Sequence, residues 1–127
     1  MSESFGELIV LISRDLGVAL ASLLDGINMG KAGLGKIQEA SIVLIEIFNK
    51  YGKRLREERH SILSFTLRDA GIGLWVRAEE IASRGYMNED LVYFKEIYDS
   101  LNEIKTTMDS GEYKTELDKL RKAKFKA

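Results

Sequence analysis

The chain has 127 residues, of which 45% are hydrophobic and 31% are charged, and its formal net charge is -1. This length fits one domain with its own core, and the near-neutral charge excludes a general electrostatic attraction to nucleic acid or anionic lipid. The chain has no cysteine and no proline. Disulfides, thiolate nucleophiles and cysteine-bound zinc are therefore excluded, and long helices are favoured.

The N-terminal segment predicts a buried helix that begins near the start of the chain. Ser4 and Glu7 have capping-box spacing, just ahead of an apolar run that extends from Leu8 to Leu24. Arg14 and Asp15 interrupt this run, whereas a membrane-spanning helix needs about 20 predominantly apolar residues. The first residues also lack the basic region of a signal peptide, so we expect a cytoplasmic protein with no membrane contact.

The first helix is predicted to end near Asp25 and Gly26, because residues 26–35 contain four glycines. Glycine adds backbone entropy that a helix must remove, so such density is typical of a loop. A glycine-rich loop of this length is longer than most bundle connections, and we expect either a flexible joint or a binding loop. A second amphipathic helix follows over residues 36–51, with Gly52 as its C-terminal cap.

The third helix is predicted to begin near Ser61 and to end at Gly85. It carries two apolar sides and is therefore expected to be enclosed by its neighbours. One side consists of Ile62, Phe65, Ile72 and Val76, and the other of Leu63, Leu67, Ala70, Leu74 and Ile81.

The fourth helix is predicted to begin after Asn88 as N-cap and to carry an apolar stripe that ends at Met108. Four helices joined by mostly short turns favour an all-α fold, an up-down-up-down four-helix bundle over residues 1–111. Residues 112–127 form a charged, lysine-rich C-terminal tail, either a frayed helix or a disordered segment. This tail is expected to solubilise the chain or to bind RNA or a partner.

The densest basic segment lies between the second and third helices. Clustered lysines and arginines release counterions from nucleic acid, so this segment is a candidate for nucleic-acid or anion binding. Glu57 and Glu58 offset two of the five charges, which leaves a solvated turn as the alternative. The five basic residues are Lys50, Lys53, Arg54, Arg56 and Arg59.

His60 is the single histidine of the chain, and Glu57 precedes it by three residues. This spacing matches one half of a di-iron carboxylate site, but a second half is missing, so we expect no metal and no cofactor and a solvated His60. Small helical RNases of the HEPN type carry an arginine four to six residues before a histidine. Arg54 or Arg56 with His60 meets that spacing, and Arg56 shares a helix face with His60.

Four residues of the third helix are candidates for an interface. Asp69 lies on an otherwise apolar side, where a buried carboxylate needs an arginine or a helix terminus as partner. Gly71 and Gly73 each cost about 1 kcal/mol in a helix interior relative to alanine, which indicates a close approach of helices, within the chain or between subunits. Trp75 lies beside them.

One stretch of the chain contains residues in the same order as in a known protein family. They are Phe65, Leu67, Ala70, Gly71, Ile81, Ala82, Gly85 and Tyr86. This stretch resembles the four-helix-bundle proteins encoded in ribosomal RNA intervening sequences and their relatives, the accessory variability determinants of diversity-generating retroelements. The likeness covers residues 36–110 and includes the basic turn that starts at Tyr51 and Gly52. The proline and the Asn-Ile-Ala-Glu-Gly segment usual in the intervening-sequence proteins are absent here.

The resemblance implies a ring-like pentamer and, for the retroelement members, binding to a reverse transcriptase and to nucleic acid through strongly basic surfaces. This chain lacks that excess of positive charge. We therefore expect a non-enzymatic adaptor that self-assembles and binds a protein or ribonucleoprotein partner. The alternatives are a small RNase of HEPN type and a small helical subunit of an RNA-guided, CRISPR-type effector complex.

Overall fold

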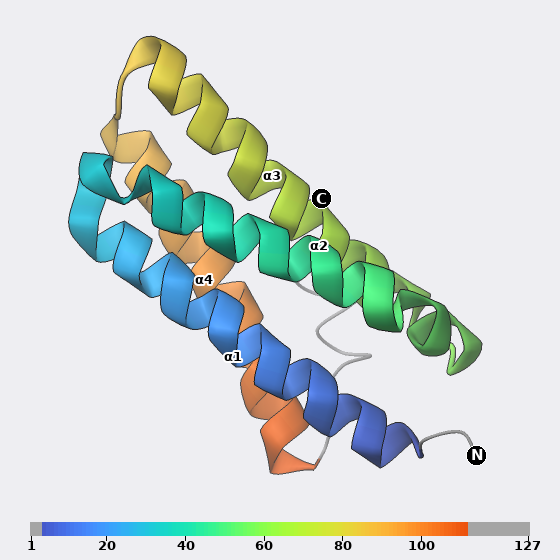
Figure 1. Ribbon diagram of the computed structural model, residues 1–127. Helices are drawn as coiled ribbons and strands as arrows, with labels where there is room; N and C mark the ends of the chain where they lie inside the picture. Colours follow the sequence, from blue (N-terminus) through green and yellow to red (C-terminus); the bar gives the residue numbers. More distant parts are fainter. Residues whose placement is uncertain (1–3, 112–127) are drawn as a thin grey trace.

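The computed structural model of the protein describes residues 4–111, and the predicted tail at 112–127 lies outside them. Four α-helices occur in the described range, and a short 3-10 helix, η1, joins the first two. Their bounds are α1 Phe5–Met29, η1 Gly30–Gly33, α2 Leu34–Glu57, α3 Ser61–Arg84 and α4 Asn88–Ser110. Consecutive α-helices run in opposite directions (Figure 1). The predicted all-α class is confirmed, since residues 4–111 contain no strand.

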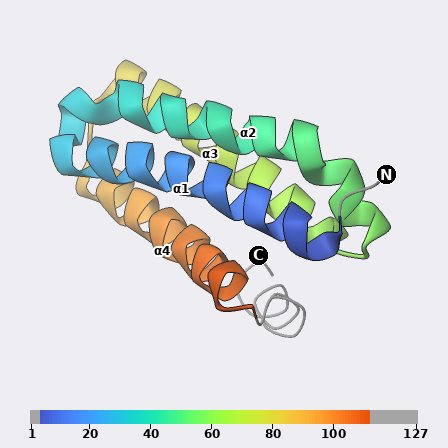
Figure 2. The same ribbon diagram turned by 60° about the horizontal axis from the view of Figure 1, so that its bottom comes forward.

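The helices pack in the order α4, α1, α2, α3. Figure 2 shows α1 between α2 and α4, whereas α3 packs mainly on α2 and touches α4 at few residues. Apolar side chains at helical spacing on all four helices fill the space between them. Among the fully buried ones are Leu16, Leu23, Leu44, Ile47, Leu67, Leu74 and Phe94. Within residues 4–111, no helix is long and apolar enough to span a bilayer.

The start of α1 is as predicted, because the Ser4 hydroxyl accepts a hydrogen bond from the backbone N–H of Glu7 at 3.1 Å. The predicted glycine-rich loop is wrong. α1 continues through Gly26 to Met29, and η1 leads directly into α2. A Cβ at Gly33 would lie 2.8 Å from the Cα of Gly26 and would collide with its carbonyl oxygen. These glycines permit a tight helical corner where the backbones of α1 and η1 touch.

The predicted end of the second helix at Gly52 is also wrong, because α2 continues to Glu57. Gly52 is buried in the helix. The chain then reverses through Arg59, whose φ of 65° lies in the left-handed region, and the N–H of His60 donates to the carbonyl of Leu55 at 2.7 Å. The α2–α3 turn therefore contains residues 58–60 alone.

The turn between α3 and α4 depends on Gly85, as predicted. Its φ is 98°, and its N–H donates to the carbonyl of Ile81 at 2.7 Å. The N-cap of α4 is Met87, one residue before the predicted Asn88. The carboxylate of Asp90 accepts a hydrogen bond from the Met87 N–H at 2.8 Å, so an acidic side chain inside the helix caps it.

Candidate functional site

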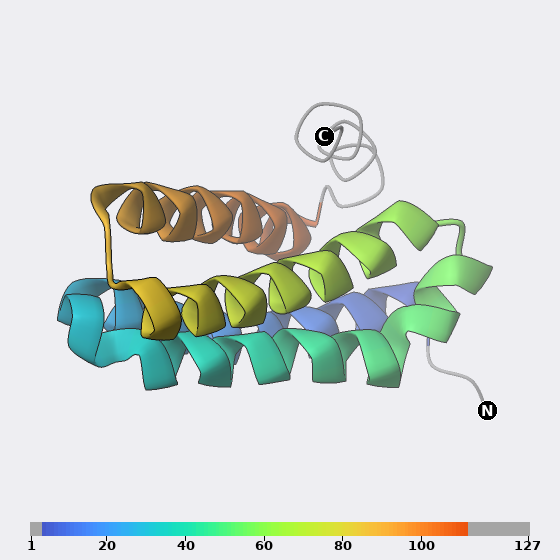
Figure 3. The same ribbon diagram turned by 90° about the horizontal axis from the view of Figure 1, so that it is seen from above.

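α2 and α3 lie side by side (Figure 3), and Gly71 of α3 lies against α2. The Gly71 carbonyl accepts a hydrogen bond from the Ser41 hydroxyl at 2.5 Å, and a Cβ at Gly71 would lie 2.9 Å from the side chain of Ile45. A Cβ at Gly73 would collide with the hydroxyl of Tyr93 on α4. The close approach predicted for these glycines occurs, and it joins helices of the same chain.

The side of α3 that faces away from α1 is apolar and exposed. Phe65, Ile72 and Val76 follow one another at spacings of seven and four residues, and their exposed fractions are 37%, 45% and 47%. The prediction that α3 is enclosed is therefore wrong for this side. Phe48 of α2 packs on Phe65 and extends the same surface. We define the α2–α3 face by Phe48, Phe65, Ile72, Trp75 and Val76.

Two arginines lie on the aromatic rings at one end of the α2–α3 face. The Phe48 and Phe65 ring centroids are 5.8 Å apart. The guanidinium of Arg56 lies 5.7 and 5.8 Å from these two centroids, and that of Arg68 lies 5.5 and 4.8 Å from them. Each such contact contributes about 0.5–1 kcal/mol at an exposed site. The rings therefore hold two like charges together at the surface.

Asp69 also lies on this side of α3, next to the aromatic end. Its carboxylate binds the Arg68 guanidinium at 2.9 Å, so the predicted pairing with an arginine is confirmed. Its predicted burial is wrong, because 64% of its side chain is exposed. An exposed ion pair of this kind contributes about 0–1 kcal/mol to stability. Asp69 and Trp75 thus belong to an exposed surface rather than to the core.

The five basic residues of the α2–α3 junction have different surroundings. Lys50 lies 3.8 Å from Asp15 of α1, Arg54 lies 4.0 Å from Glu57, and Arg56 turns to the aromatic rings on the α3 side. Two more side chains are exposed and form no ion pair within residues 4–111: Lys53 and Arg59. Three of the five basic side chains thus contact different neighbours.

His60 is a packing residue in this structure. It is 9% exposed, and its ring stacks on Phe5 with centroids 5.1 Å apart and an interplanar angle of 8°. The predicted solvated histidine is therefore wrong. Arg54 lies near Glu57, and the Arg56 guanidinium lies on two phenylalanine rings. This arrangement gives the histidine a role in joining α1 to the α2–α3 turn.

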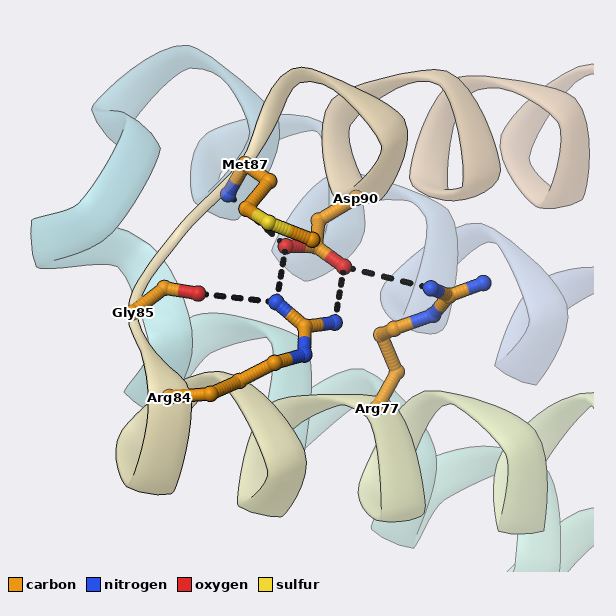
Figure 4. A network of polar contacts seen from close by, with 5 residues as sticks. All are labelled: Arg77, Arg84, Gly85, Met87 and Asp90. Atoms are coloured by element: carbon orange, nitrogen blue, oxygen red, sulfur yellow. Dashed lines mark hydrogen bonds and ion pairs between the residues drawn. The ribbon is translucent and has the colours of Figure 1, made fainter.

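A buried carboxylate at the α3–α4 turn was not predicted (Figure 4). Asp90 is fully buried, and Arg84 binds it through two hydrogen bonds, at 2.8 and 3.0 Å. Arg77 adds a third contact at 3.2 Å, and Arg84 also donates to the Gly85 carbonyl at 2.8 Å. The hydrogen bonds from Arg84 lower the pKa of Asp90 to about 2, against the opposing effect of burial. All these partners come from α3 and its turn, so the network fixes the exit of the chain from α3.

This lowered pKa predicts an acid-dependent loss of stability. The ionised Asp90 stabilises the folded state fully above its unfolded pKa of 3.8, and the contribution is lost as the pH falls toward 2. We expect the melting temperature of the wild type to fall more steeply between pH 5 and pH 2.5 than that of Asp90→Asn, as followed by circular dichroism. Equal slopes would contradict the assignment, since all other carboxylates are common to both proteins.

A second polar cluster links α1 to α4. The buried Ser13 hydroxyl donates to Asp109 and accepts from the Lys105 ammonium at 3.2 Å, and Lys105 lies 2.7 Å from Asp109. The hydrogen bonds from Lys105 and Ser13 lower the pKa of Asp109. The cluster therefore joins α1 to α4.

The described residues hold no group of three histidine, aspartate or glutamate side chains placed to bind a metal ion. No protein-family model, curated protein or solved structure matches the chain. Candidate functional features are therefore identified from the residues and contacts of this chain. Among them, the α2–α3 face combines exposed apolar side chains with charges of both signs.

Proposed function

We propose that the protein is a non-enzymatic four-helix-bundle adaptor that self-assembles through the α2–α3 face and binds a protein or ribonucleoprotein partner. The observation that carries the proposal is the row of exposed apolar side chains on α3. Ile72 and Val76 are 45% and 47% exposed at the centre of a helix whose other apolar side is buried. Contiguous exposed apolar surface on a small protein marks an interaction site.

The apolar side chains of the face form one strip along α3. From Phe65 to Val76 they span eleven residues, which corresponds to about 16 Å of helix. The ring of Phe48 on α2 adjoins this strip. Phe65 and Trp75 add aromatic surface, which is enriched at interface centres.

The charges of the face support a second copy of the chain as the occupant. Arg56 and Arg68 contribute positive charge, and Asp69 and Glu79 contribute negative charge, all at exposed or partly exposed positions of α2 and α3. A surface with charges of both signs can be complementary to itself, as a two-fold contact requires.

A ribonucleoprotein partner would contact residues outside this face. Lys53 and Arg59 are exposed at the α2–α3 junction and have no ion pair within residues 4–111. Two side chains release few counterions, so we expect RNA binding by the protein alone to be weak and to depend modestly on salt concentration. Binding of RNA that falls steeply with salt would instead favour a role inside an RNA-guided complex.

Ile72→Glu tests the proposed function. A carboxylate at the centre of the face would be buried without a partner on association, so we expect self-association to weaken by about 30-fold or more. The measurement is the molar mass by light scattering across a concentration series. The matched control is Val10→Glu on α1, where the wild-type side chain is 68% exposed outside the α2–α3 face.

The control is expected to keep the wild-type mass at each concentration. A wild-type protein that stays monomeric at high concentration would overturn the proposal. So would an Ile72→Glu variant that associates as the wild type does. Helicity measured by circular dichroism verifies that both variants fold, because both substitutions replace exposed side chains of helices.

A further inference from the structure

The charged side chains of the α2–α3 face differ between its two ends: one end is mainly basic and the other mainly acidic. Arg56 and Arg68 lie at the end where α2 stops and α3 begins, on the rings of Phe48 and Phe65. We call this the basic end. The acidic end lies toward the C-terminus of α3, where a shallow hollow is lined by Val76, Glu79, Glu80, Ser83 and Arg84.

Each end keeps charge that no residue in the described range 4–111 neutralises. Arg68 is paired with Asp69, whereas Arg56 forms no ion pair within residues 4–111 and lies on the aromatic rings. At the acidic end, Glu79 likewise forms no ion pair within the described residues. Arg84 lines the same hollow, but its guanidinium is held by Asp90 and by the Gly85 carbonyl. Arg56 and Glu79 are thus available to a partner.

The spacing of these ends is symmetric about Ile72. Phe65, which carries the Arg56 guanidinium, lies seven residues before Ile72, and Glu79 lies seven residues after it. Seven residues are two helical turns, or about 10.5 Å, so the three positions share one side of α3. A two-fold axis at Ile72 would bring the basic end of one copy to the acidic end of the other.

We infer that two copies of the chain pair with their α3 helices antiparallel about a two-fold axis near Ile72. The basic end of each copy then contacts the acidic end of its partner, and the contact occurs twice. This inference rests on the proposed function, which it makes specific. A parallel pairing would place Arg56 against its own equivalent and Glu79 against its own equivalent, which like-charge repulsion disfavours.

Charge reversal tests the pairing directly. Arg56→Glu alone places two glutamates together at each contact, and Glu79→Arg alone places two arginines together. We expect each single variant to lose at least tenfold in self-association at low ionic strength. The double variant Arg56→Glu/Glu79→Arg restores opposite charges at both contacts, and its association returns to within about threefold of wild type.

An equimolar mixture of the two single variants provides the sharpest measurement. In a mixed pair, the two substituted positions would face each other with opposite charges, and the unchanged Glu79 of one variant would face the unchanged Arg56 of the other. We expect the mixture to form a one-to-one pair, with twice the mass of one chain by light scattering, although each variant alone stays monomeric at that concentration. Lys95→Glu, an exposed charge reversal on α4, is the matched control and leaves association unchanged.

The outcomes separate this inference from the proposed function. If Ile72→Glu dissociates the protein, but neither the mixture nor the double variant regains association, the α2–α3 face is the site of self-association and the antiparallel pairing is wrong. A wild-type mass of five chains, as the family resemblance implies, would also overturn the two-fold pairing. Circular dichroism verifies folding, and Arg56→Lys, which keeps the charge at the basic end, provides a second variant that retains association.

Discussion

Asparagine in place of Asp90 is expected to lower the free energy of unfolding by roughly 3 kcal/mol. The substitution keeps the shape of the side chain but removes the charge that neutralises Arg84 and Arg77. It also replaces a carboxylate oxygen that accepts the Met87 N–H at 2.8 Å. Removing one partner of a buried ion pair costs about 3–5 kcal/mol. The lower end applies here because 33% and 27% of the two arginine side chains are exposed and can reach water.

The measurement is urea denaturation followed by circular dichroism, with the slope compared between variants. Glu89→Gln is the matched control, because Glu89 is the exposed neighbour of Asp90 in the first turn of α4. Its loss should be below about 1 kcal/mol, the magnitude of a charge–dipole interaction at a helix end. A loss in Asp90→Asn no larger than that of the control would show that the network contributes little to stability.

Alanine in place of Gly33 is expected to destabilise the protein by about 2 kcal/mol or more. The added methyl group would overlap the backbone of Gly26, whose Cα and carbonyl carbon would both lie 2.8 Å away. A flexible side chain could move aside, but here the obstacle is the backbone of α1. Relief therefore requires that the corner formed by α1, η1 and α2 opens, which displaces the buried side chains next to it.

Gly35→Ala is the control for this corner, because a Cβ at Gly35 would meet nothing within 4 Å. Gly35 lies in the first turn of α2, where alanine is at least as compatible with a helix as glycine, so stability is expected to stay constant or to rise by up to about 1 kcal/mol. Thermal melts of both variants test the pair. Similar melting temperatures for the two variants would mean that the corner is as compliant as a loop.

The features of the fold that depend on near neighbours in the chain could be predicted. Ser4 caps α1 through a residue three positions away, and Gly85 ends α3 through its own backbone conformation. Such interactions are local, so residue type and spacing are enough to identify them. The α4 cap was misplaced by one residue because its carboxylate comes from Asp90, inside the helix, rather than from the N-cap.

The glycine-rich segment shows how packing overrides local preference. Four glycines in residues 26–35 favour a loop by backbone entropy. In the folded chain, the contact between Gly26 and Gly33 requires the absence of side chains. Gly26 and Gly33 are separated along the chain but are neighbours in space. No residue pattern within the segment distinguishes a flexible loop from a tight corner.

The contacts among the residues of the candidate site could be predicted only in part. The sequence singled out Arg56 for its place in a basic segment, Asp69 for its place on an apolar side of the third helix, and Trp75 for its place beside two glycines. It did not reveal that Arg56 and Arg68 share the Phe48 and Phe65 rings, since these residues come from two helices. A basic residue and an aromatic residue on different helices give no signal in spacing along the chain.

The amino-acid sequence by itself determined that the chain is all-α, where α1 begins, where α3 begins and ends, and that α3 has two apolar sides. Only the tertiary structure decided which of those sides is covered. Leu67 and Leu74 are fully buried, whereas Ile72 is 45% exposed. Periodicity records that a side is apolar, but burial depends on which neighbour packs against it. α2 approaches α3 at Gly71, where no side chain intervenes, and the opposite side is left open.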